Sequence, residues 1–234
     1  MTLNELAVKH DTDKQESIHN YMEKYERHLG GFRGDKINIV EIGIALGASL
    51  KVWRDAFPLA TIWGIDIESR CLAYGEERVK ILIGDQSNES FLDSVTKKIG
   101  EATIIIDDGS HINAHHQITF NNLFTNLLVP DGVYVIEDTV TCYQEGGKHS
   151  GHRAKLPNNT EDYFKNKIGD LNFNGKIEGF GNKQRDFDFV TSHSGVDKNS
   201  FSYWEEYIKG MSFYKNMIFI EKDNGFKRSD NEKN

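Results

Sequence analysis

The feature that most constrains the fold is a regular alternation between short apolar runs and longer amphipathic stretches. The apolar runs have the length of β-strands, and the stretches between them have helical periodicity. Strands that alternate with helices are typical of a parallel sheet with helices on both faces. We therefore predict a doubly wound α/β sheet. The strand candidates are "INIVEIGI" (37–44), "TIWGIDI" (61–67), "VKILIGD" (79–85), "ATIIIDD" (102–108) and "VYVIED" (133–138).

Three amphipathic stretches predict the helices between these strands. In the first, Leu50, Trp53 and Phe57 recur on one side, and Pro58 ends the helix. The "PDG" at 130–132 predicts a turn before the last strand. The helix candidates are "GASLKVWRDAF" (47–57), "ESFLDSVTKKIG" (89–100) and "HHQITFNNLFTNLL" (115–128).

The two ends of the chain follow a different pattern. The segment "NELAVKHDTDKQESIHNYMEKYERHLGG" (4–31) reads as mostly helical, and "TEDYFKNKIGDL" (160–171) predicts one more helix. The segments "RDFDFVTSH" (185–193) and "MSFYKNMIFIEKD" (211–223) read as strands, which predicts an antiparallel edge. We expect a single domain, 1–234, with an N-terminal helical lid (1–34), a cofactor-binding core (35–138), a substrate loop (139–183), C-terminal strands (184–222) and a flexible tail (223–234).

Composition excludes several classes of function. A net charge of −8 argues against a nucleic-acid partner, because phosphate binding needs a basic surface. The two cysteines form no zinc pattern, which favours reduced thiols in the cytoplasm. Neither a signal peptide nor a membrane span is expected, because no apolar run is long enough.

Acidic residues close all five predicted strands. The carboxyl ends of the strands in such a sheet meet where ligands bind, and unrelated surface acids would not keep this phase. The residues at these ends are Glu41, Asp66, Asp85, the Asp107–Asp108 pair, and the Glu137–Asp138 pair.

The first strand end suggests a nucleoside site. Gly43 and Gly47 permit a tight turn, but Ala45 replaces the middle glycine of a dinucleotide fingerprint. Asp66 ends the next strand, where a carboxylate can accept both ribose hydroxyls. The alternative is a tight turn followed by a solvated acid.

Asp108, Glu137 and Asp138 are candidate ligands for a hard divalent cation such as Mg²⁺. Carboxylates in one cleft repel one another unless a cation neutralises them, and oxygen ligands select hard ions. The alternative is a set of helix N-caps. Asp107 should point away from Asp108, because neighbours in an extended segment face opposite sides.

His111 follows the turn after Asp108 and is the candidate general base, since imidazole takes up a proton near neutral pH. A helix-start or structural histidine is the alternative. His115 and His116 are interpreted as structural or substrate-lining.

Together, "TDKQESIHNYMEKYERH", "VEIGIALGASLKVWRDAFPLATIWGIDI", "IIIDDGSH" and "VYVIEDT" resemble class I S-adenosylmethionine-dependent methyltransferases. More narrowly, they resemble the metal-dependent sugar O-methyltransferases of macrolide biosynthesis. The resemblance implies a Rossmann-like class I methyltransferase fold, S-adenosylmethionine and Mg²⁺ as cofactors, and a sugar-containing small molecule as acceptor. Relative to the larger macrolide enzymes, we do not expect their extra N-terminal domain in this chain, so a homo-oligomer is left open.

The resemblance also implies site roles. His111 would be the general base, and Asp108, Glu137 and Asp138 the metal ligands. The sugar hydroxyl would lose its proton to His111 and attack the sulfonium methyl. The implied cofactor-binding residues are Tyr21, Tyr25, Glu41, Gly43, Gly47, Ser49, Asp66, Asp85, Gln86 and Asp108.

We expect the acceptor to be a glycoside, a nucleotide sugar or a surface polysaccharide precursor. Tyr143 and His149 are candidates to contact it; the alternative is that both are ordinary loop residues. A catechol-type methyltransferase is the nearest rival. An NAD-dependent sugar-modifying enzyme is a more distant alternative, because Tyr163 and Lys167 have the spacing of its YxxxK pair. The third alternative is a non-catalytic cofactor-binding module.

Overall fold

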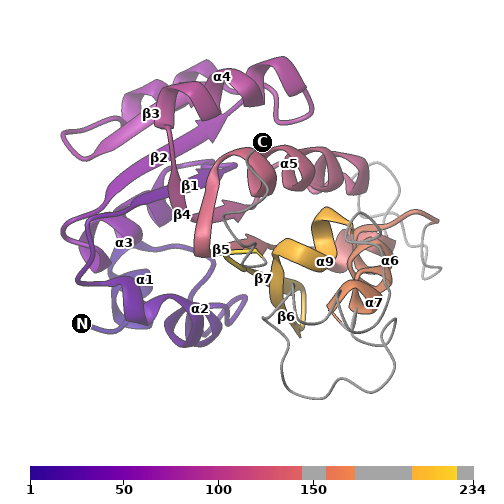
Figure 1. Cartoon of the computed structure of the whole chain (residues 1–234). Helices are drawn as coiled ribbons and strands as arrows, with labels where there is room; N and C mark the ends of the chain where they lie inside the picture. Colours follow the sequence, from indigo (N-terminus) through magenta and orange to yellow (C-terminus); the bar gives the residue numbers. More distant parts are fainter. Residues whose placement is uncertain (144–156, 172–201, 226–234) are drawn as a thin grey trace, which may run out of the picture.

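A seven-stranded sheet in the order β3-β2-β1-β4-β5-β7-β6 organises the chain (Figure 1). The computed structural model describes residues 1–143, 157–171 and 202–225. Five strands are parallel, while β7 runs antiparallel to β5 and β6 antiparallel to β7. The strands are β1 (Asn38–Ile42), β2 (Thr61–Asp66), β3 (Val79–Ile83), β4 (Ala102–Asp107), β5 (Leu128–Ile136), β6 (Ile208–Tyr214) and β7 (Met217–Lys222).

The predicted α/β sheet is thus confirmed, and its antiparallel edge is formed by β7 and β6. The segment 211–223 divides into β6 and β7 at Asn216, which has a φ of 62°. Asparagine tolerates this left-handed conformation better than most residues. The other predicted strand, 185–193, lies outside the described residues.

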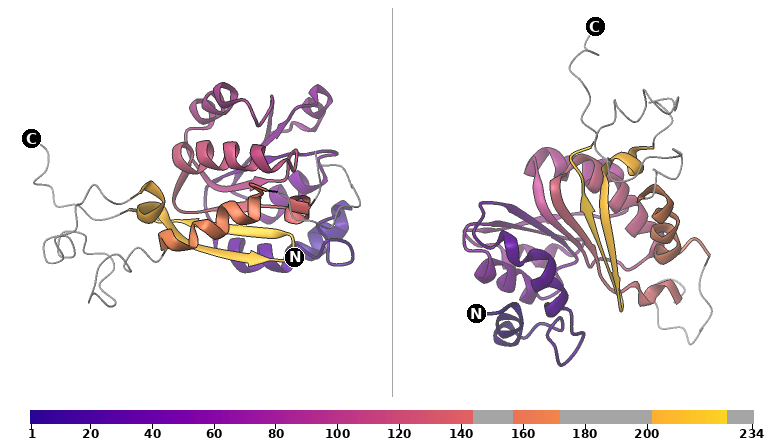
Figure 2. Two further views of the ribbon diagram at one scale, coloured as in Figure 1. Left: turned by 90° about the vertical axis from the view of Figure 1, so that its right-hand side faces the viewer. Right: turned by 60° about the horizontal axis from the view of Figure 1, so that its bottom comes forward.

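Helices cover both faces of the sheet, as two further views show (Figure 2). The first three α-helices lie on one face, and α4 and α5 lie on the other. None of the helices in the described ranges has the length and apolar character needed to cross a membrane. The helices are α1 (Leu3–His10), α2 (Met22–Leu29), α3 (Ala48–Ala56), α4 (Glu89–Ile99), α5 (Asn113–Asn126), α6 (Thr160–Asn166), α7 (Ile168–Leu171) and α9 (Tyr203–Tyr207), with 3₁₀ helices η1 (Gly30–Phe32), η2 (Ser69–Tyr74) and η3 (Thr139–Tyr143).

Side chains on β4 alternate between the two cores. Ile104 and Ile106 pack with the N-terminal helices, whereas Ile105 packs with α4 and α5. All three are fully buried. The period of two is what a strand between two helical layers requires.

The N-terminal segment departs from the mostly helical prediction. Helix α1 ends at His10, and its C-cap residue Asp11 has a left-handed φ of 56°. Helix α2 begins only at Met22. An irregular turn connects them. Leu3, Tyr25 and Leu29 are fully buried in the core, so these helices form a layer of the domain.

The predicted turn at 130–132 is wrong, because β5 continues through it. Asp131 adopts a φ of 58°, and the pairing of β5 with β4 shifts between Ala102 and Ile104. A Cβ on Gly132 would lie 2.8 Å from the Thr103 carbonyl oxygen. The turn-like residues therefore make an irregularity inside the strand.

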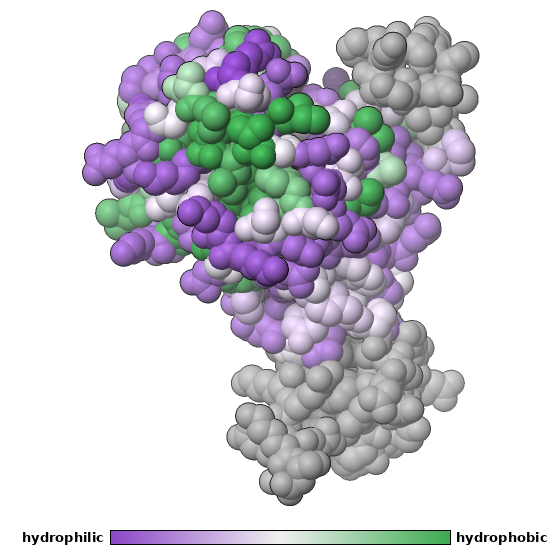
Figure 3. All heavy atoms as spheres, turned by 90° about the horizontal axis from the view of Figure 1, so that it is seen from above, coloured by the Kyte–Doolittle hydropathy of each residue, from purple (hydrophilic) through white to green (hydrophobic). Residues whose placement is uncertain are grey.

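The surface of the described chain carries hydrophobic residues as well as charge. Seen from above, hydrophobic residues form a continuous area with hydrophilic residues around it (Figure 3). Leu46, Ile67 and Leu72 are each more than half exposed. Ile67 also borders a cavity described below, so part of the exposed apolar surface lies beside a site.

Candidate active site

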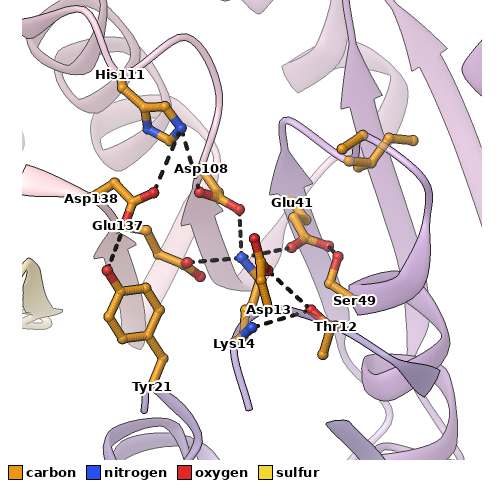
Figure 4. Close-up of polar contacts among 12 residues, drawn as sticks. Thr12, Asp13, Lys14, Tyr21, Glu41, Ser49, Asp108, His111, Glu137 and Asp138 are labelled. Carbon is orange, nitrogen blue, oxygen red and sulfur yellow. Dashed lines mark hydrogen bonds and ion pairs between the residues drawn. The ribbon is translucent and has the colours of Figure 1, made fainter. Parts of the chain in front are cut away.

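Four of the predicted acids lie together at the carboxyl ends of β1, β4 and β5 (Figure 4). They are Glu41, Asp108, Glu137 and Asp138. The amide of Asp108 donates to the Ile42 carbonyl at 2.9 Å, and that of Glu137 donates to Asp107 at 3.0 Å. These bonds extend the sheet by one residue on each strand. The backbone then turns sharply, since His111 and Asp138 have φ values of 55° and 53°.

The two aspartates of β4 face opposite sides, as the alternation along a strand predicts. Asp107 is fully buried and accepts hydrogen bonds from Gln86 Nε2 (3.0 Å) and the Tyr134 hydroxyl (3.1 Å). Asp108 faces the other acids. Asp107 therefore belongs to a polar network behind the cluster.

Three side chains form a group that could hold a cation. His111 Nε2 lies 3.9 Å from Asp108 Oδ1 and 3.9 Å from Asp138 Oδ2. One ligand atom from each residue lies within 4.8 Å of the others. Of the predicted metal ligands, Asp108 and Asp138 are thus together, with the candidate base beside them.

Lys14 lies in the middle of the acids, a position that its sequence context did not predict. Its ammonium lies 2.5 Å from Asp108 Oδ2, 2.8 Å from Glu137 Oε2 and 3.8 Å from Glu41 Oε1. A lysine between polar residues in "DTDKQ" reads as a surface residue, yet the side chain is only 3 % exposed. The position of the turn after α1 could not be read from periodicity.

Two tyrosines complete the contacts from the N-terminal segment. The Tyr21 hydroxyl donates to Asp138 Oδ1 at 2.5 Å, and the Tyr25 hydroxyl donates to Glu137. Tyr25 also packs edge-on against Trp53. Both tyrosines, which the resemblance placed over the cofactor, therefore donate hydrogen bonds to acids of the cluster.

Glu41 and Glu137 have pKa values above the ordinary value of a glutamate. Burial raises the pKa of Glu41 to about 7, and Lys14 offsets only part of this effect. Burial and the neighbouring Asp108 raise the pKa of Glu137 to about 7. Burial alone would lower the pKa of Lys14, but the surrounding carboxylates raise it well above its ordinary value. One ammonium is therefore shared by several acids.

Glu41→Gln should flatten the pH dependence of stability. A carboxyl whose pKa rises from 4.5 to about 7 on folding favours the folded state below pH 4.5, and this contribution is lost as pH rises through 7. At about 1.4 kcal/mol per pKa unit, the loss is on the order of 3 kcal/mol. Thermal unfolding without metal between pH 5 and 8 measures it. Glu23→Gln, at a side chain 70 % exposed, is the control and should unfold like wild type; an unchanged slope in Glu41→Gln would contradict the expectation.

A cavity of about 220 Å³ lies beside the cluster. Asp66 stands at its wall and accepts hydrogen bonds from the amides of Ile44 (3.0 Å) and Glu68 (2.9 Å). The predicted cofactor residues Gly43, Asp66, Asp85 and Gln86 line it. The structure therefore brings these four residues together around one cavity.

Gly43 lies between this cavity and the backbone of Asp108. Its φ is +81°, and a Cβ there would lie 2.1 Å from the Asp108 carbonyl oxygen. Gly47 begins α3 with a φ of +71° and packs against the Tyr74 ring. Both glycines are thus required by the backbone.

Glu41 and Ser49 do not line the cavity. Glu41 is fully buried and accepts from the Ser49 hydroxyl (2.8 Å) and from Trp53 Nε1 (3.1 Å). Its other oxygen, Oε1, has no hydrogen bond within the described part of the chain. Glu41 thus retains one acceptor atom near Lys14.

A larger cavity of about 560 Å³ opens on the other side of His111 and Asp138. The N-terminal segment contributes Asn20 and Tyr21 to its wall, and the turn before β7 contributes Asn216. Tyr143 is described but is not among the lining residues, and His149 lies outside the described residues.

The remaining histidines have other partners. His115 Nδ1 lies 2.9 Å from the Ser110 hydroxyl, and the ring borders the smaller cavity. His116 is buried, with Nδ1 2.9 Å from the Thr160 hydroxyl. This is consistent with one lining and one structural histidine.

The Tyr163–Lys167 pair has no place in either cavity wall. The Tyr163 hydroxyl donates to Asn121 at 2.5 Å, and the Lys167 ammonium lies 3.9 Å from the centroid of the Trp204 ring. These contacts join α6 to α5 and α9, so the pair packs helices together.

The sheet order and the flanking helices give this chain the fold of class I methyltransferases. MycE, a methyltransferase from mycinamycin biosynthesis whose structure contains Mg, S-adenosylhomocysteine and mycinamycin VI, has a TM-score of 0.79 at 28 % identity. The match covers 100 % of this chain and 57 % of MycE. No protein-family model matches.

The chain is a homologue of the macrolide sugar O-methyltransferases. It is 31 % identical to demethylmacrocin O-methyltransferase of Streptomyces fradiae over 94 % of this chain and 53 % of that protein. It is 32 % identical to mycinamicin VI 2''-O-methyltransferase of Micromonospora griseorubida over 94 % and 52 %. The chain thus spans about half the length of these relatives.

Proposed function

We propose that the chain is an S-adenosylmethionine-dependent, divalent-metal-dependent O-methyltransferase acting on a sugar hydroxyl. The observation that carries this proposal is the place of His111, between two carboxylates and at the wall of the larger cavity. The smaller cavity, with Asp66 and the glycine turn, lies on the other side of Asp108. One cavity suits a nucleoside and the other an acceptor.

The donor set fits a hard cation. Asp108, Glu137 and Asp138 offer only oxygen atoms, and carboxylate oxygens suit Mg²⁺. His111 Nδ1 is buried and has no hydrogen-bond partner in the described part of the chain. A bound cation would make a hydroxyl more acidic, and S-adenosylmethionine would supply the methyl group.

The residues of the chain then have distinct tasks. His111 Nε2 accepts the proton of the acceptor hydroxyl. The carboxylates of Asp108 and Asp138, each 3.9 Å from Nε2, stabilise the imidazolium that results. The Tyr21 hydroxyl fixes Asp138 for this task.

The acceptor class follows from the relatives and from the cavity. The relatives are named for methylating a macrolide or another glycoside. We propose a sugar carried by a glycoside, a nucleotide sugar or a surface polysaccharide precursor, bound between Asn20, Tyr21 and His111. A catechol-type acceptor is the alternative outcome of an activity screen. The cytoplasmic location and the homo-oligomer stay predictions.

Asp138→Asn should lower methyl transfer by about 10²-fold or more, because it removes a charged cation ligand and a partner of His111. Asparagine suits the φ of 53° at this position, so the backbone should be kept. The measurement is transfer of labelled methyl from S-adenosylmethionine to a panel of sugars and catechols, with and without EDTA.

The matched control is Asp131→Asn, at an exposed aspartate with a φ of 58°. It should retain wild-type activity. Full wild-type activity in EDTA, with Asp138→Asn equally active, would contradict metal dependence. Methylation of catechols alone would remove the sugar assignment.

A further inference from the structure

We propose that Lys14 sets the affinity of the metal site by competing with the divalent cation for Glu137 and Asp108. This inference rests on the metal site of the proposed function. Lys14 is thus a positioning residue: it acts through the carboxylates that it contacts.

Two hydrogen bonds hold the backbone of Lys14 in place. The Lys14 carbonyl accepts from the Tyr21 amide at 3.1 Å, and the Lys14 amide donates to the Thr12 hydroxyl at 3.5 Å. The side chain is 3 % exposed and leads directly to the strand ends (Figure 4). Its charge is therefore fixed in place.

Lys14 occupies oxygens that a cation would need. Glu137 accepts from Lys14 through Oε2 and from the Tyr25 hydroxyl through Oε1. Asp108 gives Oδ2 to Lys14, and its Oδ1 faces His111. A cation that binds Glu137 through Oε2 must therefore share that oxygen with the ammonium or displace it.

The charge balance points to competition rather than to replacement of the metal. Glu41, Asp108, Glu137 and Asp138 carry four formal negative charges when ionised, and Lys14 carries one positive charge. The cluster keeps an excess of negative charge that attracts a divalent ion. The ammonium still repels that ion at short range, where burial weakens screening by water.

Removal of the charge should tighten metal binding. The probe is Mn²⁺ alone, titrated by calorimetry and by electron paramagnetic resonance of the free ion. Lys14→Met, which keeps much of the side-chain length, should bind Mn²⁺ at least about tenfold more tightly than wild type. Lys14→Arg keeps the charge and should stay much closer to wild type.

Two further variants locate the effect. Lys9→Met removes an exposed lysine that pairs with Asp55 and should leave the affinity unchanged. In the Glu137→Gln background, Lys14→Met should bring a smaller gain than in the wild-type background, because Asp108 is then the one contested carboxylate that is left.

A purely structural ion pair would behave differently. Its removal would lower thermal stability without tightening Mn²⁺ binding, and a folded Lys14→Met that binds Mn²⁺ equally or more weakly overturns the proposal. If Lys14→Met does not fold, the wild-type protein decides. Mg²⁺ should then shift the side-chain nitrogen resonance of Lys14 and leave that of Lys9 unmoved, and an unmoved Lys14 signal overturns the proposal.

The outcomes separate the two proposals. If wild type binds Mn²⁺ and Asp138→Asn does not, but Lys14→Met binds no more tightly, only the role of Lys14 falls. If neither wild type nor Lys14→Met binds Mn²⁺, the metal site and the role of Lys14 fall together.

Discussion

His111→Asn should lower the rate constant of methyl transfer by about 10²- to 10⁴-fold, the usual contribution of a general base. In the proposed mechanism, the imidazole of His111 takes up the hydroxyl proton at the wall of the larger cavity, with Asp108 and Asp138 beside it. Asparagine is chosen because His111 has a φ of 55°, which asparagine tolerates.

The measurement is a single-turnover assay with labelled S-adenosylmethionine, together with calorimetric binding of S-adenosylhomocysteine. Binding should change little, because His111 does not line the smaller cavity. His10→Asn is the control, since His10 pairs with Asp55 away from the site. A His111→Asn rate within threefold of wild type would show that another group takes the proton.

Gly43→Ala should destabilise the protein by about 3 kcal/mol or more, or prevent folding. A Cβ would lie 2.1 Å from the Asp108 carbonyl oxygen and 2.6 Å from Gly109 Cα, and both are backbone atoms that cannot move aside alone. The φ of +81° adds about 1–2 kcal/mol for any side chain, and overpacking adds about 1–3 kcal/mol.

Urea unfolding followed by circular dichroism measures this change in free energy. Gly31→Ala is the matched control, because a Cβ at that position would meet nothing within 4 Å and its φ is not in the left-handed region. Its stability should stay within about 0.5 kcal/mol of wild type. A Gly43→Ala protein as stable as this control would contradict the expectation, because it would show that the backbone of Asp108 and Gly109 can move to accept a Cβ.

Sequence patterns predicted the sheet because β1, β4 and the second half of β5 are buried on both faces and read as continuous apolar runs. The meeting of Asp66, Asp108 and Glu137 at one edge followed from the parallel direction of these strands. Period-two alternation also predicted that Asp107 turns away from Asp108, and its bonds to Gln86 and Tyr134 agree.

Contacts that depend on irregular backbone could not be predicted in this way. Lys14 reaches the cluster only because α1 stops at Asp11 and the chain returns through a turn with no periodic signal. The same turn places Tyr21 beneath Asp138. Likewise, the "PDG" has the composition of a turn, but β5 pairs with β4 on both sides of it, at Leu128 and at Val133, and so continues through it.

The opposite directions of Asp107 and Asp108 limit how this chain can change its length. A single-residue insertion or deletion within β4 would exchange the two carboxylates between the faces of the sheet. Asp107 would lose Tyr134 and Gln86, and Lys14 would lose Asp108. Gains and losses of single residues should therefore accumulate in the connections around β4, while its own length stays invariant among active descendants.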